Sequence, residues 1–180
     1  MKSPDVATLV RVTYRLIIFD LDGTLVTTKS GDQFRRHADD WQWLPGRLAV
    51  IAALRGAGIE MAIATNQGGV AFGIYPHEAM RSAVESAAYE AKIWTVYSNF
   101  THPKATIATY RSESVNRKPG PGMLYHAMNT FHVPPARTLM VGDRDEDRQA
   151  AARARCDFQD ATRFFAQFNE EARHETAHGA

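Results

Sequence analysis

The chain has 180 residues, of which 44% are hydrophobic and 23% are charged, so it has enough apolar material for one sizeable core. Its formal net charge of +1 excludes a protein that coats nucleic acid through an overall basic field, and also an acidic disordered chain. The single cysteine, Cys156, excludes an internal disulfide framework and a cysteine-rich zinc site. We expect one domain over residues 1–180, with its core at about 14–168 and a tail at about 169–180. With no apolar leader and no run of roughly 20 apolar residues, the expected location is the cytoplasm, without a membrane partner.

The first predicted element is the short apolar run at 15–19, which contains two isoleucines and a phenylalanine. It ends abruptly in Asp20-Leu21-Asp22-Gly23, as a buried strand does where it enters a turn. Residues 27–43 mix glycine, serine, charged residues and two tryptophans without clean periodicity. We therefore expect an irregular flap or short hairpin there, with its tip over the end of the first strand.

Helices and strands then alternate along the chain. A helix is predicted to open at Pro45-Gly46 and close at Gly56, with Leu48, Ile51, Ala52 and Leu54 on one face. The next predicted elements, in chain order, are a strand at 59–64, a helix at 76–91, a strand at 92–97, a polar loop at 98–118, a helix at 123–131, a strand at 138–141, a helix at 145–155, a strand near 156–158 and a helix through Phe164 and Phe165. This alternation predicts an α/β fold, namely a Rossmann-like, doubly wound parallel sheet with helices on both faces.

Reactive side chains follow the predicted strands at the edge where such folds bind ligands. They are Asp20 and Asp22 after the first strand, Thr65 and Asn66 after the second, Asp143 and Asp147 after the fourth, and Lys118 from a loop that can reach the same edge. Four crowded carboxylates raise one another's pKa unless a cation joins them, and Mg²⁺ prefers such oxygen ligands. The ion and Lys118 would neutralise a phosphate group, and Asp20 and Asp22 would act as nucleophile and acid/base.

Each of these residues has a simpler interpretation when it is considered alone. An aspartate after a strand is usually a turn residue, and Thr65-Asn66 is more often a turn or helix-cap pair. Asp143 and Asp147 could be a cap and a first-turn acid that favour the helix dipole. The catalytic interpretation is favoured because all of these groups arrive in order, at the ends of elements of one sheet.

These motifs resemble those of the haloacid dehalogenase superfamily in its phosphatase form. The matching segments span residues 16–147 and are Asp20-Leu21-Asp22-Gly23-Thr24-Leu25, Thr65-Asn66, Lys118-Pro119 and Gly142-Asp143-Arg144-Asp145-Glu146-Asp147. The resemblance implies that Asp20 is the nucleophile and a metal ligand, and that Asp22 is the acid/base and a ligand through its carbonyl. It implies phosphate binding by Thr65, Asn66 and Lys118, and magnesium binding by Asp143 and Asp147, the latter directly or through water. The short gaps between motifs resemble the minimally capped subclass, which has a small flap and no large cap domain.

The substrate stays open between two classes. Residues 21–31, with Phe34 and Asp40-Trp41, resemble the 3'-phosphatase domain of polynucleotide kinase/phosphatases, which implies a polynucleotide 3'-phosphate end and a setting in DNA repair. Residues that would then contact the nucleic acid are Arg117, Lys29, Arg35 and Trp41. The chain has no GxxxxGK[ST] loop, so a kinase or repair partner would be a separate chain.

The alternative substrate is a small phosphorylated metabolite, because Thr65-Asn66-Gln67 and Arg117-Lys118-Pro119 are similar to segments of heptose bisphosphate phosphatases. Histidinol phosphate belongs to the same alternative. Heptose bisphosphate phosphatases usually have a zinc loop of three cysteines and a histidine, whereas residues 98–118 contain His102 and no cysteine, so we expect no zinc. A non-catalytic phosphate-binding module would be expected to have lost a motif aspartate, and none is lost. A phosphotransferase is a further alternative, which product analysis with alcohol acceptors would separate from a hydrolase.

Overall fold

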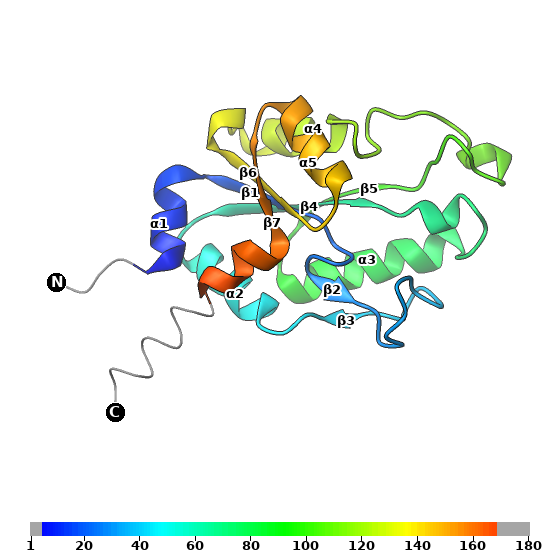
Figure 1. Cartoon of the computed structure of the whole chain (residues 1–180), viewed down its shortest axis with the longest axis horizontal. Coiled ribbons are helices and arrows are strands. Elements are labelled where there is room, and N and C mark those ends of the chain that lie inside the picture. The colour runs from blue at the N-terminus through cyan, green and yellow to red at the C-terminus, as the bar shows by residue number, and fades with distance from the viewer. Residues whose placement is uncertain (1–4, 169–180) are drawn as a thin grey trace.

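The computed structural model describes residues 5–168 and has a five-stranded parallel sheet at its centre (Figure 1). The strand order is β5-β4-β1-β6-β7. The strands are β1 (Leu16–Phe19), β4 (Glu60–Asn66), β5 (Thr95–Asn99), β6 (Thr138–Gly142) and β7 (Asp157–Asp160). In the register of the central strands, Leu16 is opposite Glu60 of β4 and Thr138 of β6. The predicted doubly wound α/β fold is confirmed.

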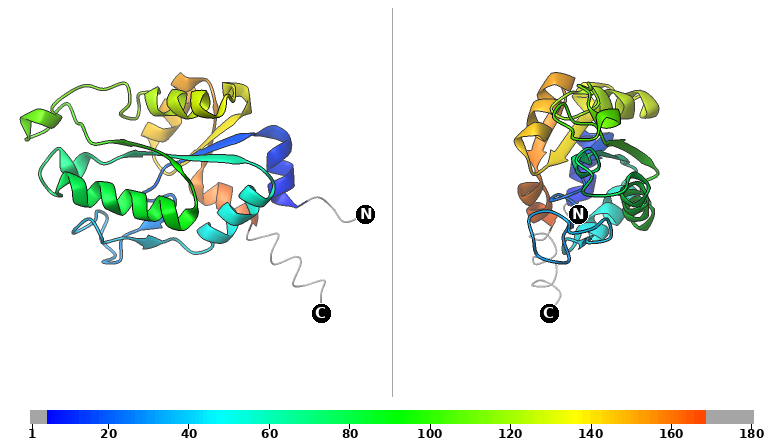
Figure 2. Two further views of the ribbon diagram at one scale, coloured as in Figure 1. Left: turned by 180° about the vertical axis from the view of Figure 1, so that it is seen from behind. Right: turned by 90° about the vertical axis from the view of Figure 1, so that its right-hand side faces the viewer.

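Alternate side chains of β1 enter two separate cores on opposite faces of the sheet. Leu16 and Ile18 pack against α4 (Gly122–Phe131) and α5 (Asp145–Ala154). Ile17 and Phe19 belong to the other core, which includes residues of α1 (Val6–Thr13), α2 (Arg47–Gly56), α3 (His77–Ala91) and the helical residues 161–168. Figure 2 shows these helical layers from behind and end-on. Burial on both faces explains why β1 is apolar throughout.

A short hairpin follows β1, as expected, and no large cap domain is inserted between residues 5 and 168. Strands β2 (Val26–Thr27) and β3 (Gln42–Trp43) pair in antiparallel fashion, and the loop between them is the flap, residues 28–41. Asp40 stabilises this flap through hydrogen bonds to other residues of the flap. Its Oδ1 accepts a hydrogen bond from Ser30 N at 2.8 Å, and its Oδ2 accepts from Ser30 Oγ at 2.7 Å and from Arg36 N at 2.8 Å.

Several element boundaries differ from those expected from the sequence. Helix α1 was not predicted; Asp5 caps it by accepting a hydrogen bond from Thr8 N at 2.7 Å. β5 begins at Thr95 and not at 92, because Lys92 ends α3 in the left-handed conformation with φ 54°. β4 continues to Asn66, so the polar motif after Ala64 belongs to the strand itself.

Two of the four residues predicted on the buried face of α2, Leu48 and Ala52, are exposed, whereas Ile51 and Leu54 are buried as predicted, together with Val50. Three short 3-10 helices complete the described chain, at Gly68–Val70, Ala108–Tyr110 and Pro135–Arg137. The expected tail at 169–180 lies outside the described residues. Within residues 5–168, no helix has the length and apolar character needed to cross a membrane.

Candidate active site

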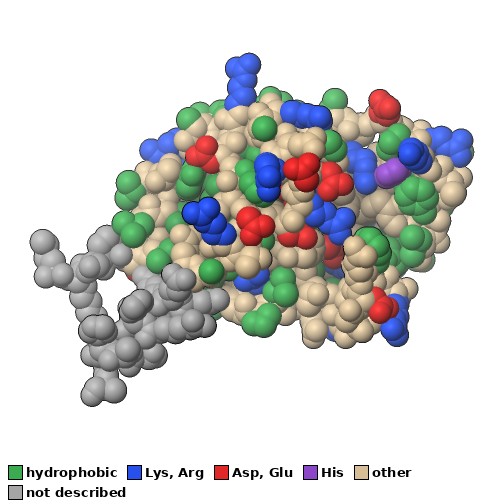
Figure 3. All heavy atoms as spheres, in the orientation of Figure 1, with side chains coloured by type: hydrophobic (Ala, Val, Ile, Leu, Met, Phe, Trp, Pro, Cys, Tyr) green, Lys and Arg blue, Asp and Glu red, His purple; other side chains and the backbone are tan. Residues whose placement is uncertain are grey.

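A cavity of about 740 Å³ opens at the carboxyl ends of β1, β4 and β6, where an open α/β sheet is expected to bind its ligand. Strand ends, the flap and the loop before α4 all contribute to its wall. On the face of the molecule drawn in Figure 3, acidic side chains gather near the centre with basic side chains around them. The cavity therefore combines both signs of charge, as a site for an anion and a cation requires.

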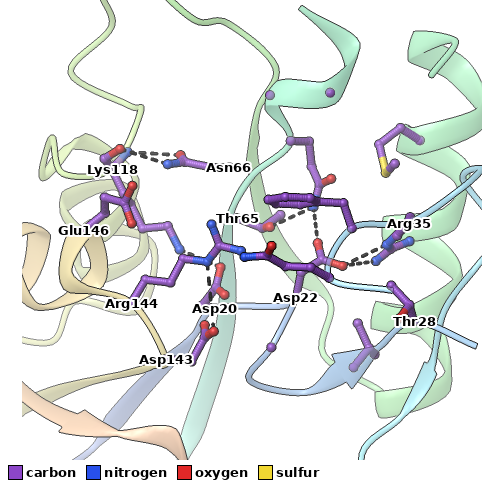
Figure 4. A pocket seen from close by; sticks show the side chains of 18 of the residues that line it. Asp20, Asp22, Thr28, Arg35, Thr65, Asn66, Lys118, Asp143, Arg144 and Glu146 are labelled. Atoms are coloured by element: carbon purple, nitrogen blue, oxygen red, sulfur yellow. Dashed lines mark hydrogen bonds and ion pairs between the residues drawn. The ribbon is translucent and has the colours of Figure 1, made fainter. Parts of the chain in front are cut away.

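Lys118 lies between two carboxylates at the base of the cavity. Its Nζ is 2.6 Å from Asp20 Oδ1 and 2.6 Å from Asp147 Oδ1, and all three side chains are buried. Figure 4 shows Lys118 and Asp20 in the cavity. Burial disfavours the ammonium form, but the two carboxylates outweigh it and hold the pKa of Lys118 above its usual value. Burial also raises the pKa of Asp20 to about 7, because the lowering effect of Lys118 only partly offsets desolvation and repulsion from Asp147 and Asp22.

The carboxylate cluster fits a hard divalent cation. Asp20, Asp143 and Asp147 each offer an oxygen, and these oxygens lie within 4.8 Å of one another. Partial desolvation, together with repulsion from Asp147, raises the pKa of Asp143 as well, although this residue is more exposed than Asp20 and Asp147. A cation among these oxygens would favour their ionised forms, and three carboxylate donors suit Mg²⁺. Asp147 also accepts a hydrogen bond from Arg144 N at 3.1 Å. It therefore caps the start of α5, as its simpler interpretation predicts, and belongs to the carboxylate cluster as well.

Gly23 is required beside this cluster for two reasons. Its φ is +87°, and a Cβ atom there would lie 2.2 Å from Asp143 Oδ2. Thr24, the next residue, donates a hydrogen bond from Oγ1 to Asp143 Oδ1 at 3.3 Å. The turn after β1 thus leaves space for Asp143 and also binds it.

Asp22 enters the cavity beside Thr65 and away from the contact between Lys118 and Asp20 (Figure 4). Its Oδ1 accepts a hydrogen bond from Arg35 Nε at 2.8 Å and lies 2.6 Å from Arg35 Nη2, while its Oδ2 accepts from Gln67 Nε2 at 2.7 Å. Gln67 Nε2 also donates to Thr65 Oγ1 at 2.9 Å, so the Thr65 hydroxyl hydrogen is available to a ligand. These contacts fix Asp22 and Thr65 relative to each other.

Some of the other predicted site residues line the cavity and some do not. Arg117 lines the cavity, with Nη1 donating to Thr101 O at 3.0 Å, while the side chain of Asn66 binds the backbone of Lys118. Arg35 lines the cavity too, but it is buried against Asp22. Lys29 and Trp41 are not among the lining residues. Lys29 Nζ donates to Asp39 O at 3.3 Å, and the Trp41 ring packs on Trp43 with ring centroids 6.2 Å apart.

Among the lining residues that were not predicted as part of the site, four make contacts of note: Gln67, Phe34, Phe72 and Arg144. Gln67 directly follows Thr65-Asn66, and Arg144 lies within the motif at 142–147, so the positions of these two residues were available signals. Phe34 is 61% exposed on the flap, and the Arg144 guanidinium lies 6.0 Å from its ring centroid. Such contacts between distant loops leave no pattern in the sequence.

Comparison with known proteins gives matches that are all phosphatases, with different substrates in their names. The family model for polynucleotide kinase 3 phosphatase matches residues 15–176. The D-glycero-beta-D-manno-heptose-1,7-bisphosphate 7-phosphatase of Yersinia pestis is 32% identical over 143 residues, covering 77% of this chain and 74% of that protein. The crystal structure of D,D-heptose 1.7-bisphosphate phosphatase from B. bronchiseptica, a complex with magnesium and phosphate, is 32% identical with a TM-score of 0.62, covering 80% of this chain and 78% of that chain. A putative HAD-like phosphatase from Mesorhizobium loti is 28% identical with a TM-score of 0.64, covering 80% and 70%.

Proposed function

The chain belongs to the polynucleotide kinase 3 phosphatase family, within the haloacid dehalogenase superfamily of phosphatases, and from this premise we propose that it is a magnesium-dependent hydrolase of small phosphorylated metabolites, of the heptose bisphosphate type. The main structural support is the buried contact of Asp20 with Lys118, 2.6 Å long, beside the carboxylates of Asp143 and Asp147. A nucleophile, a phosphate-binding cation and a set of metal ligands thus occupy one end of a cavity.

The metal would be held by Asp20 and Asp143, by the backbone carbonyl of Asp22, and by Asp147 directly or through water. When bound, magnesium supplies positive charge that neutralises the carboxylates and the phosphoryl oxygens. Lys118 has three ammonium hydrogens, and two of them face Asp20 and Asp147. The third would bind a phosphoryl oxygen, together with the hydroxyl of Thr65.

In the first step, a carboxylate oxygen of Asp20 attacks phosphorus, and the bond from phosphorus to the leaving oxygen breaks. Asp22, in its acid form, gives its proton to that oxygen, so that an alcohol leaves and Asp20 becomes an aspartyl-phosphate. In the second step, Asp22 as carboxylate takes a proton from water, and the water oxygen attacks phosphorus. The bond from phosphorus to Asp20 breaks, which releases inorganic phosphate and restores both aspartates.

The flap supports a small substrate better than a polynucleotide. Three of its basic side chains are engaged within the flap or at its base: Arg35 with Asp22, Arg36 with Asp32, and Lys29 with a backbone carbonyl. Groups in such pairs have less capacity to bind additional phosphates along a strand. The named relatives above point to the same alternative, and they give no support to a role in DNA repair.

The absence of cysteines from residues 98–118 counted against a heptose bisphosphate phosphatase, but the loop before α4 is held by hydrogen bonds of its own. His102 Nδ1 accepts a hydrogen bond from Lys104 N at 3.0 Å, and the backbone of His102 bonds to Tyr110 O at 3.0 Å and to Ala105 N at 3.0 Å. Arg111 Nε adds a bond to Ala105 O at 2.8 Å. Hydrogen bonds between its own residues thus shape this loop, so its conformation does not depend on zinc-binding cysteines.

The test is phosphate release from four substrates at fixed magnesium: a heptose 1,7-bisphosphate, histidinol phosphate, a 3'-mononucleotide and a 3'-phosphorylated oligonucleotide. We expect the highest kcat/KM for the heptose bisphosphate, with little dependence on salt. The Asp20→Asn variant is the control for contaminating phosphatase. A clear preference for the oligonucleotide at low salt, which shrinks as salt rises, would contradict this proposal and indicate that polynucleotide 3' ends are the substrate.

A further inference from the structure

Arg35 is a buried arginine of the flap whose side chain contacts the candidate acid/base. It follows Asp22 by 13 residues and is only 7% exposed. Its Nε and Nη2 atoms lie 2.8 and 2.6 Å from Asp22 Oδ1, and its Nη1 donates to Ala38 O at 2.9 Å. Figure 4 shows the guanidinium directed at Asp22 from the side opposite Asp20. Arg35 therefore approaches Asp22 and not the phosphate position beside Lys118.

We propose that Arg35 is a positioning residue, which holds the Asp22 carboxyl group in the orientation that transfers a proton to the leaving oxygen. This inference rests on the proposed function, because it assigns a role within the same phosphatase reaction. Arg35 acts through Asp22, so it is not itself a catalytic group. It makes the flap a part of the catalytic apparatus as well as a cover.

The contacts of Asp22 explain why an arginine is needed. Gln67 binds only Oδ2, at 2.7 Å, which would leave the carboxyl group free to turn about that bond. The Asp22 side chain is 37% exposed, so water would otherwise compete for Oδ1. The Arg35 guanidinium holds Oδ1 through the hydrogen bond from Nε and the ion-pair contact of Nη2, while Gln67 holds Oδ2, so that both oxygens of the group are restrained.

Contacts from Tyr75 and from within the flap fix Arg35 before any substrate arrives. Tyr75 Oη donates a hydrogen bond to the carbonyl of Arg35, and Asp40 accepts from the backbone N–H of the next residue, Arg36. Burial of the Arg35 side chain limits its rotamers further. The arginine is therefore preorganised, as a residue that positions a catalytic group should be.

The experiment compares two esters of the same phosphate, an alkyl phosphate and p-nitrophenyl phosphate, by kcat/KM, which reports the first chemical step. An alkoxide needs a proton in order to leave, whereas p-nitrophenolate leaves with little help. We expect Arg35→Met to lower kcat/KM for the alkyl ester by about 100-fold or more, and for p-nitrophenyl phosphate by less than about tenfold. Asp22→Asn should give the same selectivity, and the Arg35→Met/Asp22→Asn double variant should lose little more than Asp22→Asn alone.

The matched control is Arg36→Met, which removes a flap arginine that pairs with Asp32 on the surface, and both rates should stay within about twofold. Arg35→Lys keeps the positive charge without the planar guanidinium, and it replaces Arg35→Met in the experiment if that variant fails to fold. We expect its selectivity between the two esters to lie between those of the wild type and Arg35→Met. Equal losses on both esters, or no loss on either, would overturn the positioning role. Absence of wild-type activity on both esters, or full activity of Asp20→Asn, would instead overturn the proposed function.

Discussion

Asn66 and Lys118 exchange two hydrogen bonds, although 52 residues separate them in the chain. Asn66 Nδ2 donates to the carbonyl oxygen of Lys118 at 2.8 Å, and Lys118 N donates to Asn66 Oδ1 at 3.0 Å. The side-chain amide at the end of β4 thus binds the backbone of the loop before α4. The same loop position directs the Lys118 ammonium between Asp20 and Asp147. Asn66, expected to bind phosphate, therefore has a clear structural role in holding the lysine.

The first prediction concerns Asn66→Asp. The carboxylate retains an acceptor for Lys118 N but loses the donor to Lys118 O, which it repels. We expect a displaced lysine and a fall in kcat/KM of roughly 10- to 100-fold, with a loss of unfolding free energy of about 1–3 kcal/mol. Steady-state kinetics and chemical denaturation measure the two effects. Asn129→Asp, on the exposed side of α4, is the matched control, and equal behaviour of the two variants would contradict the role of Asn66.

The second prediction concerns the metal. Exhaustive chelation should abolish hydrolysis, and Asp143→Asn should raise the magnesium concentration needed for half-maximal rate. Magnesium at about 100 times its dissociation constant should stabilise the wild-type fold by about 2.7 kcal/mol, and the variant less at the same concentration. Thermal unfolding with and without magnesium measures this difference. Asp145→Asn, whose carboxylate binds Gln149 at the start of α5, should behave as wild type. Undiminished activity after chelation would exclude the proposed cofactor.

The sequence predicted the sheet well because local patterns specify it. The apolar run before Asp20 defines β1, since a strand buried on both faces tolerates no polar residue. The polar motifs mark strand ends, and parallel strands must bring those ends to one edge. Asp20 and Asp143 were therefore predicted to lie together, with Lys118 reaching the same edge from a loop.

The remaining features depend on tertiary contacts that no local pattern encodes. The ion pair of Arg35 with Asp22 closes an irregular loop, and its partner could have been any basic residue of the flap. Helix α1 is only eight residues long and lies before the first recognisable motif. Leu48 is exposed because of the way α2 is rotated about its own axis against its neighbours. The spacing of the apolar residues in α2 does not determine this rotation.

The third prediction concerns the only cysteine in the chain. Burial raises the pKa of Cys156 to about 12, and its Sγ lies 3.8 Å from Ala151 O as a donor. The thiolate, which is the reactive form, should therefore be scarce in the folded protein at pH 8. We expect a disulfide reagent to label the native protein far more slowly than the denatured protein. Colour development in stopped flow measures both rates, and labelling of native protein as fast as of denatured protein would contradict the prediction.

The last prediction tests how the flap is held. Hydrogen bonds from Arg36 N and from Ser30 hold the pKa of Asp40 well below its ordinary value. A carboxylate with a lowered folded-state pKa stabilises the fold above its unfolded pKa, about 3.8, and this contribution is lost as the pH falls further. Asp40→Asn should therefore lower the unfolding free energy at pH 7, and the gap from wild type should stay constant down to about pH 5 and shrink below pH 4. Denaturation across this pH range measures the gap, and limited proteolysis should cut the variant first between residues 28 and 41. Asp39→Asn, next to it and exposed, is the control, and a gap that widened at low pH would refute the role of the Asp40 charge.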